Sequence, residues 1–308
     1  MSTSLFLSRK KKKNNKKEII SMDPFSVLDT FRGLTVSQWM SDHLEIPVLV
    51  SAAYLYLVLY VPDRIKDDPP RKMKTANIYW NLLLTVFSAV GAYYCVPRQL
   101  EMTFAKSYKI QDDNDPNIFH TREGSFYNSV CVWYPDQFYA GRVGFFVCLF
   151  ILSKIPEMLD TVFLVFKKKP VIFLHWYHHI TVMLYCWHSY VYHISAGLIF
   201  SSMNYFVHSF MYFYYLLAEL GYGRQLRPIA PLITVLQIAQ MVVGGFVEVY
   251  SLYYIYFTEE GCPGANACNC RLGFLMYASY FFLFSKLFKD KYFGPKKPKK
   301  DAIKPKEQ

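Results

Sequence analysis

A lysine, a glutamate, an aspartate and three histidines lie inside two apolar segments between Lys154 and His179. The stretch reads KIPEMLDTVFLVFKKKPVIFLHWYHH, with a short basic link of three lysines and Pro170 between the two segments. Both segments are long enough to enter a bilayer, where ionisable side chains are costly and usually functional. This feature constrains the fold more than any other, and it predicts a polar site at membrane depth.

The composition agrees with a membrane protein. Of 308 residues, 53% are hydrophobic and 19% aromatic, and the charges gather in connections and tails. The net charge of +11 is placed between apolar runs, whereas a nucleic-acid binder would spread its Lys and Arg over a folded surface. The apolar patch before Lys10 is too short for a secretory signal, so the first membrane helix is expected to direct insertion. We expect a bilayer partner and no nucleic acid.

The apolar segments predict an all-α polytopic fold with seven transmembrane helices. Most of them approach the roughly 20 residues that a spanning helix needs. We expect a polar N-terminal tail over residues 1–45, a helical domain over 46–288 and a basic tail over 289–308. The predicted spans are Ile46–Val61, Ile78–Val96, Gly144–Phe166, Val171–Tyr190, Ile199–Leu220, Leu232–Tyr256 and Leu272–Phe288.

The distribution of Lys and Arg predicts the orientation of the helices. Most of these residues lie in the connections after the first, third and fifth spans and in the C-terminal tail. The positive-inside rule then places the C-terminus in the cytosol and the N-terminus on the far side. The basic run Arg9–Lys17 opposes this assignment, but it lies far from the first span. Lys304 and Lys306 resemble a dilysine retrieval signal of the endoplasmic reticulum, although a solvated basic tail explains them equally well.

The cysteines indicate one candidate disulfide. Seven cysteines without zinc-site spacing argue against a metal framework. Cys131 lies in one long non-cytosolic loop, and Cys262, Cys268 and Cys270 lie in the other. An oxidising lumen would allow Cys131 to pair with one of the three, and the sequence does not choose among them.

Four consecutive predicted helices each carry polar residues on one face, as spacings of three and four residues require. The predicted helix directions bring these faces to a similar depth, within about 5 to 13 Å of the cytosolic surface for the fourth and sixth spans. The sequence therefore predicts one pocket in the cytosolic half. Its members are Lys154, Glu157, Asp160 and Thr161 on the third span, His175, His178 and His179 on the fourth, Asn204, His208, Met211, Tyr212 and Tyr215 on the fifth, and Thr234, Gln237 and Gln240 on the sixth.

Each polar group also has a structural interpretation. Lys154 and Glu157 are compatible with an ion pair that holds helices together, and glutamines often bond between membrane helices. His188 and His193 lie near the far end of the fourth span and are interpreted as interfacial residues. Three imidazoles on one buried face, however, leave several nitrogens to satisfy, which favours function for the box itself.

A metal enzyme is the first alternative, because an HxxHH box can bind iron in membrane desaturases and hydroxylases. Those enzymes use several such boxes. This chain has one, and His43 and His120 lie outside the predicted spans. A seven-helix transporter or receptor is a second alternative, but no repeated halves are visible in the sequence. We therefore expect no metal and no cofactor.

Four ordered blocks resemble the signature blocks of the very long chain fatty acid elongases, the ELO family of 3-oxoacyl-CoA synthases. The blocks are KIPEMLDT (Lys154–Thr161), HWYHH (His175–His179), NYFVHSFMYFYY (Asn204–Tyr215) and TVLQIAQ (Thr234–Gln240). The resemblance implies an endoplasmic reticulum enzyme in which six of seven helices enclose an acyl tunnel. It implies condensation of an acyl-CoA with the co-substrate malonyl-CoA to a 3-oxoacyl-CoA two carbons longer, with loss of CO2 and CoA. Within the family, HWYHHIT looks more like the enzymes for saturated and monounsaturated chains.

The resemblance also implies roles for the residues of the pocket. His178 is expected to accept the acyl group, since histidine is an accepted covalent nucleophile and no cysteine is expected in the pocket. His208 would share that role or bind the thioester, and His175 and His179 would orient the acceptor or move protons. Asn204, Gln237 and Lys154 are candidate donors to the enolate oxygen, with Glu157 and Asp160 fixing Lys154 and the histidines.

The substrates and partners follow from the same resemblance. Gln240, Tyr212 and Tyr215 are expected to line the substrate tunnel, and Lys167 and Arg224 belong to basic groups available to the CoA phosphates at its cytosolic mouth. A 3-oxoacyl-CoA reductase, a dehydratase and an enoyl-CoA reductase would complete the cycle. A homodimer, the preferred chain length and the division of labour among the histidines are left open.

Overall fold

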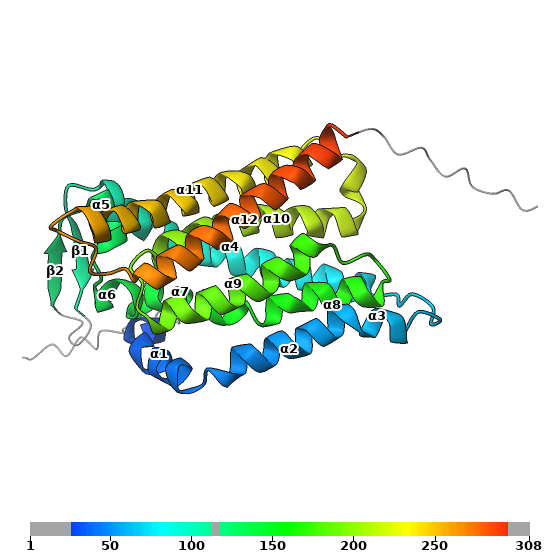
Figure 1. The fold of residues 1–308 in the computed structure, drawn as a ribbon, viewed down its shortest axis with the longest axis horizontal. Coiled ribbons are helices and arrows are strands. Elements are labelled where there is room, and N and C mark those ends of the chain that lie inside the picture. Colours follow the sequence, from blue (N-terminus) through cyan, green and yellow to red (C-terminus); the bar gives the residue numbers. More distant parts are fainter. Residues whose placement is uncertain (1–25, 113–117, 295–308) are drawn as a thin grey trace, which may run out of the picture.

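The computed structural model describes residues 26–112 and 118–294, which form an elongated bundle of helices (Figure 1). The basic run Arg9–Lys17 and the dilysine ending at Lys306 lie outside these residues. Six long helices match six of the predicted spans, with ends that differ by a few residues. They are α2 (Glu45–Leu59), α4 (Lys74–Phe104), α9 (Phe173–Val191), α10 (Gly197–Leu220), α11 (Ala230–Phe257) and α12 (Ala267–Tyr292).

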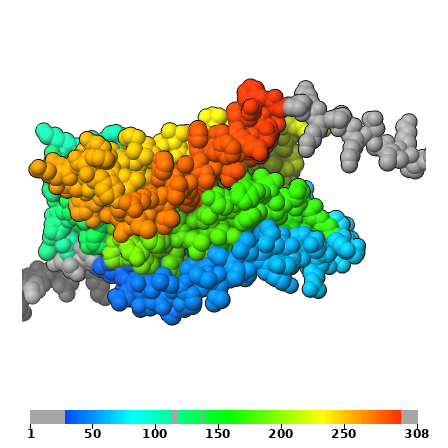
Figure 2. Space-filling view, in the orientation of Figure 1, coloured from blue at the N-terminus to red at the C-terminus, as the bar shows by residue number. Residues whose placement is uncertain are grey.

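The long helices pack in pairs along the bundle. α4 packs along α10 and α11 packs along α12, while α9 contacts both α12 and α2. The space-filling view shows α12 lying above α9, with α2 below it (Figure 2). α10 ends at Gly221, whose φ of +113° is a left-handed conformation that glycine adopts without steric cost. At the start of α12, the Asn266 side chain accepts hydrogen bonds from the backbone of Cys268 and Asn269.

The third predicted span is broken, so the prediction of one continuous helix there was wrong. α7 (Gly141–Ser153) stops before Lys154, a short 3₁₀ turn η2 (Pro156–Met158) follows, and α8 (Leu159–Phe166) completes the crossing. Pro156 explains the break, because proline has no backbone N–H and its ring clashes with the preceding turn of an α-helix. The break lies at the first polar block and places Lys154 and Glu157 on irregular backbone.

The outward faces of the long helices are apolar. On α4, Leu83 and Val86 are more than half exposed, and on α11 the same is true of Val242 and Phe246. Such continuous exposed apolar faces are typical of contact with lipid. Among the described residues, α4 and α11 each meet the length and apolarity of a membrane crossing. α2 meets them only together with α1 (Gly33–Asp42), across a bend of 67°. A count of seven spans is not confirmed by this criterion.

The bundle begins earlier than the first predicted span and ends later than the last. Residues in the predicted polar tail form η1 (Ser26–Thr30) and α1, which packs against α7 and α9. Met40 on α1 is fully buried, and its carbonyl oxygen accepts a hydrogen bond of 3.0 Å from the Trp187 indole. At the other boundary, α12 continues to Tyr292, into the predicted basic tail.

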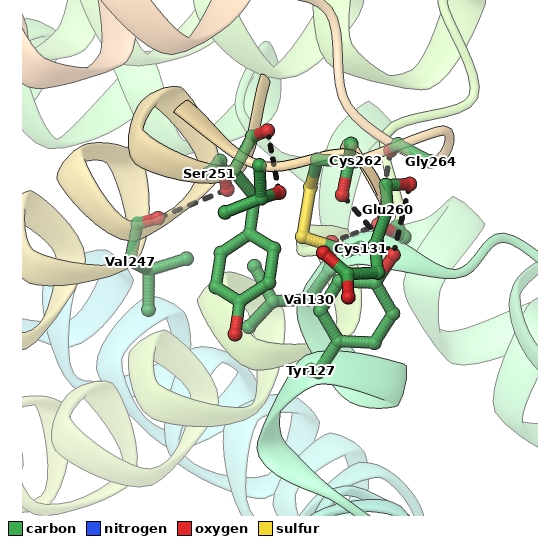
Figure 3. Close-up of a disulfide and its surroundings, with 12 residues drawn as sticks. Tyr127, Val130, Cys131, Val247, Ser251, Glu260, Cys262 and Gly264 are labelled. Atoms are coloured by element: carbon green, nitrogen blue, oxygen red, sulfur yellow. Dashed lines mark hydrogen bonds between the residues drawn. A yellow bond between two sulfur atoms is a disulfide. The ribbon is translucent and has the colours of Figure 1, made fainter. Parts of the chain in front are cut away.

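One end of the bundle carries small elements and a disulfide. A two-stranded antiparallel hairpin, β1 (Tyr108–Gln111) and β2 (Phe119–Arg122), departs from the all-α expectation, and the short helices α5 (Phe126–Cys131) and α6 (Pro135–Phe138) follow it. Cys131 is bonded to Cys262 in the loop between α11 and α12 (Figure 3). This structure decides the pairing that the sequence left open. Cys268 and Cys270 are free.

The opposite end carries the basic connections. α3 (Val61–Arg64), the link from α8 to α9 and the 3₁₀ turn η3 (Tyr222–Arg224) all lie at this end (Figure 1). Lys168 donates hydrogen bonds to the backbone carbonyls of Lys66 and Asp68, which ties two of these connections together. The connections that the sequence assigned to one side of the membrane therefore lie together in space.

Candidate active site

A cavity of about 240 Å³ lies inside the half of the bundle that faces the basic connections. Residues from η2, α8, α9, α10, α11 and α12 line it, so most of the predicted polar faces meet in one place. The lining includes Glu157, Asp160, His175, His178, His179, Asn204, His208, Met211, Tyr212, Tyr215, Thr234, Gln237 and Gln240. Of the predicted inner residues, only Lys154 and Thr161 do not line the cavity, and both contact residues that do.

Lys154 and Glu157 form a buried ion pair beside the cavity. The Lys154 ammonium lies 2.8 and 3.0 Å from the two Glu157 oxygens, and both side chains are at most 5% exposed. The same ammonium donates to Asn204 Oδ1 at 3.3 Å, and Asn204 Nδ2 lies 3.1 Å from His208 Nε2. The Asn204 side-chain amide thus links the Lys154 ammonium to the His208 ring on α10.

Asp160 is fixed by two donors from different helices. The Trp80 indole donates to Oδ1 at 2.7 Å, and the Tyr212 hydroxyl donates to Oδ2 at 3.0 Å. Asp160 also lines both the inner cavity and the wider mouth of the pocket. The carboxylate therefore holds α4, α8 and α10 together where the pocket opens.

The three histidines of the box have different surroundings. His175 Nε2 lies 2.8 Å from the Thr161 hydroxyl, which in turn lies 2.6 Å from the Tyr54 hydroxyl. The buried His179 ring packs edge-on against His175 at 4.6 Å between centroids. Within the described part of the chain, neither ring nitrogen of His178 has a hydrogen bond to a protein group. Of the box, His178 is the ring that lies in both the cavity and the channel beyond it.

A small, mostly apolar pocket of about 40 Å³, referred to as the channel, adjoins the cavity on the side toward the disulfide end. His178, Asn204, Gln240 and Met241 line both spaces. Rings of Phe150, Tyr185, Phe200, Tyr277 and Tyr280 form much of its wall, together with Cys186. No cysteine among the described residues lines the polar cavity itself, as the sequence had indicated, but Cys186 lies in this adjoining channel.

The glutamines of α11 complete the cavity wall. Gln237 Nε2 lies 3.2 Å from the sulfur of Met211, a weak acceptor. The Gln240 side chain is buried where the cavity meets the channel. Both amides therefore keep hydrogen-bonding capacity for a ligand.

The mouth of the pocket contains only some of the predicted basic residues. Lys167 and Lys169 line it, and Lys167 is paired with Glu219 at 2.8 Å. Arg224 is exposed in η3 and lines neither the mouth nor the cavity. Lys291, near the end of α12, lines the cavity although the sequence placed it in a tail. The structure thus brings Lys167 to the pocket but not Arg224.

Four residues of the site were missed by sequence reasoning. Tyr54 and Trp80 come from α2 and α4, whose polar residues were not compared with those of the other helices. Tyr280 and Lys291 come from α12, which showed no polar stripe. A usable signal existed only for Trp80, since an indole N–H in a membrane helix needs an acceptor. The other three required knowledge of how the helices pack.

No group of three or more His, Cys, Asp or Glu side chains within residues 26–112 and 118–294 is arranged to hold one metal ion. The histidines of the box and His208 are instead distributed around the cavity wall.

Comparisons with known proteins agree with the geometry. The sequence pattern of the GNS1/SUR4 family (ELO) matches residues 39–300. The chain is 52% identical to fatty acid elongase 3 of Trypanosoma cruzi (strain CL Brener), over 86% of this chain and 90% of the relative. It is 46% identical to fatty acid elongase 3 of Trypanosoma brucei brucei (strain 927/4 GUTat10.1), over 87% and 91%. It is 43% identical to very long chain fatty acid elongase 4 of Trypanosoma cruzi, over 84% of both chains. The chain therefore belongs to the ELO family of fatty acid elongases and is a membrane protein of fatty acid elongation.

Proposed function

We propose that this protein is the condensing enzyme of elongation, a very-long-chain 3-oxoacyl-CoA synthase. It joins an acyl-CoA to malonyl-CoA and releases a 3-oxoacyl-CoA, CO2 and CoA. The observation that carries the proposal is the position of His178, at the junction of a polar cavity and a narrow apolar channel. A thioester carbonyl at this junction would have its alkyl tail in the channel and its CoA in the open part of the pocket.

In the first step, a nitrogen of the His178 imidazole attacks the thioester carbonyl carbon. An N–C bond forms and the C–S bond breaks, giving an acyl-imidazole and a CoA thiolate that takes up the imidazole proton. The ring nitrogens of both His178 and His179 are free of protein partners among the described residues, as a nucleophile requires, but only His178 also borders the channel. His175 and His208 are bonded to Thr161 and Asn204. They suit orientation, proton transfer or thioester binding, and His179 packs beside them.

In the second step, malonyl-CoA loses CO2 and the electrons of the broken C–C bond form an enolate. The enolate carbon attacks the acyl carbonyl, and the imidazole leaves and regains a proton. The enolate oxygen needs preorganised donors, which stabilise developing charge most strongly in a site that excludes water. The Lys154 ammonium, the Asn204 amide and Gln237 are the candidates, with Glu157 holding the lysine and Asp160 holding the helices.

The polarity of the pocket suggests where the CoA and the acyl tail of the substrate lie. The CoA phosphates remain at the mouth, near Lys167 and Lys291, because charged phosphates do not enter an apolar channel. The acyl tail passes Tyr212, Tyr215 and Gln240 on its way inward. Six of seven spans would then enclose the tail. We also propose that the preferred acyl chains are saturated or monounsaturated, because the HWYHHIT block resembles that of the family members that act on such chains.

The setting of the enzyme belongs to the same proposal. We place it in the endoplasmic reticulum membrane with the pocket mouth and C-terminus cytosolic and the N-terminus lumenal. The disulfide at the opposite end supports this orientation, because disulfides persist in oxidising compartments. A 3-oxoacyl-CoA reductase, a dehydratase and an enoyl-CoA reductase are the expected partners, and no cofactor is required beyond the co-substrate malonyl-CoA.

The test is release of labelled CO2 from malonyl-CoA by purified protein with acyl-CoAs of several lengths. We expect release that depends on the acyl-CoA, its loss in His178→Ala, and its retention in His43→Ala, a control histidine at the exposed end of α1. No release with any acyl-CoA would overturn the assignment. Full activity of His178→Ala would leave the reaction but remove the nucleophile. Stoichiometric iron in active protein, with loss of activity on chelation, would favour the histidine-box desaturase alternative.

A further inference from the structure

The His178 ring, like that of His179, is held by packing and not by a hydrogen bond to any described residue, and of the two only His178 also lines the apolar channel. His175 and His208 are each oriented by a hydrogen bond, to Thr161 and to Asn204. The His178 ring instead packs against two other rings, with centroids 5.1 Å from Tyr280 and 5.5 Å from His179. Because no hydrogen bond to a protein group orients the His178 ring within the described part of the chain, its orientation depends on the rings that pack against it.

Tyr280 projects from α12 and is only 1% exposed. Its hydroxyl contacts the Thr181 hydroxyl and lies 3.2 Å from the backbone carbonyl oxygen of His178. Thr181 in turn donates to the Tyr177 carbonyl at 2.7 Å. The tip of Tyr280 is therefore tied to the same turn of α9 that carries the nucleophile, and its ring cannot move without breaking these contacts.

A second contact between the same helices limits their sliding. The Tyr177 hydroxyl lies 3.0 Å from the Ser279 hydroxyl, one residue before Tyr280. Both contacts join α9 to α12 beside the box, and the Tyr177 and Tyr280 rings also meet edge-on. The α9 turn that carries the box is thus held against α12 at two neighbouring points. Neither contact uses a polar group that the proposed chemistry needs.

We propose that Tyr280 is a positioning residue for acyl transfer to His178, an inference that rests on the function proposed above. The hydroxyl, held by Thr181 and the His178 carbonyl, fixes the Tyr280 ring, and the ring holds the imidazole in the orientation from which it attacks the thioester. Positioning of reacting groups is a large part of catalysis, and a displacement of about 1 Å can cost about 100-fold in rate.

The experiment separates the ring from the hydroxyl. Tyr280→Phe keeps the ring and loses both hydroxyl contacts, whereas Tyr280→Leu loses the ring as well. Thr181→Val removes the partner hydroxyl with little change in volume. Tyr253→Phe on the exposed face of α11 is the matched control, since that side chain is 54% exposed. The readout is the single-turnover rate of CoA release from acyl-CoA without malonyl-CoA, corrected for the folded fraction, together with the KM for malonyl-CoA.

We expect about a tenfold slower acylation in Tyr280→Phe and Thr181→Val and about 100-fold in Tyr280→Leu, with the KM for malonyl-CoA unchanged. Tyr253→Phe should match the unmodified protein. Wild-type acylation rates per folded molecule in the Tyr280 variants would overturn the positioning role while leaving the proposed function intact. Equal losses in all four variants would also overturn it. Absence of CoA release from the unmodified protein would remove the acyl-imidazole and this inference with it.

Discussion

Two buried polar clusters lie in opposite halves of the bundle, and they are built differently. The cavity cluster around His178 leaves ring nitrogens and amide groups facing open space. The second cluster, formed by Tyr185, His188, Ser189, Glu248 and Asn269, lies toward the disulfide end. Its members bond to one another, and Tyr185 and Ser189 also form part of the channel wall.

The second cluster is closed, in the sense that its polar groups hydrogen-bond to one another. The Tyr185 hydroxyl donates to the Glu248 carboxylate, and Asn269 donates to His188 Nδ1 at 2.8 Å and to Ser189 at 2.9 Å. A Cβ on residue 273 would fall 2.2 Å from Glu248 Oε1, so glycine is needed where α12 passes this carboxylate. A satisfied network of this kind rigidifies a core. Polar groups of the second cluster are thus bonded to one another, whereas several of those around the cavity keep hydrogen-bonding capacity for a ligand.

The largest effect is expected from the ion pair of the cavity cluster. Lys154→Met leaves the buried Glu157 charge uncompensated and should lower the free energy of unfolding by about 3–5 kcal/mol. The double variant Lys154→Met/Glu157→Leu should recover much of this stability yet remain inactive. Unfolding in detergent and CO2 release measure the two quantities. Activity in the double variant would show that the pair is structural only.

The disulfide should have the next largest effect. Changing both Cys131 and Cys262 to Ser removes a link between residues 131 apart in sequence, and disulfides of this kind typically contribute about 2–4 kcal/mol. The unfolding midpoint should fall while the KM for acyl-CoA of the folded enzyme stays unchanged. Cys268→Ser, which alters an exposed free thiol, is the control. An increase in KM would show that this end of the molecule shapes the substrate site.

The closed cluster should respond in stability rather than in chemistry. Glu248→Leu removes the carboxylate that accepts from the Tyr185 hydroxyl and should cost about 1.5–3 kcal/mol, as for loss of a hydrogen bond to a charged group. The hydroxyl keeps Asn269 Oδ1, at 3.1 Å, as its second acceptor. We expect a lower unfolding midpoint and an acylation rate per folded molecule close to that of the unmodified protein. If acylation slowed more than tenfold, the proposed separation between the two clusters would be wrong.

The smallest effect is expected at the edge of the cavity cluster. Tyr54→Phe removes one hydrogen bond to Thr161 and leaves His175 with its own bond to that hydroxyl. The loss should be about 0.5–1.5 kcal/mol in stability, with a severalfold decrease in kcat at most. Tyr56→Phe, on the exposed face of the same helix, should change neither. Inactivation by Tyr54→Phe would make the hydroxyl chain from α2 part of the chemistry.

Much of the bundle and the site could be predicted from local sequence. Six long helices follow from continuous apolar runs, and the histidine box follows from the rarity of imidazoles at membrane depth. The break at Pro156 was not predicted, although proline ends a helix locally and stands in plain view in the first polar block. The hairpin at Tyr108–Arg122 was not predicted either, because each of its strands has only four residues. A run this short cannot be distinguished from a loop by its pattern of apolar and polar residues.

By itself, the sequence determined which polar and ionisable side chains the helices carry and on which helix face each one lies, because both depend on residue type and on a period of 3.6 residues. Only the tertiary structure decided which faces meet, which cysteine pairs with Cys131, and that Tyr54, Trp80 and Tyr280 support the site. The physical reason is that contacts between helices depend on their relative rotation and translation. These are set by the packing of the whole bundle and leave no mark in any single stretch of chain.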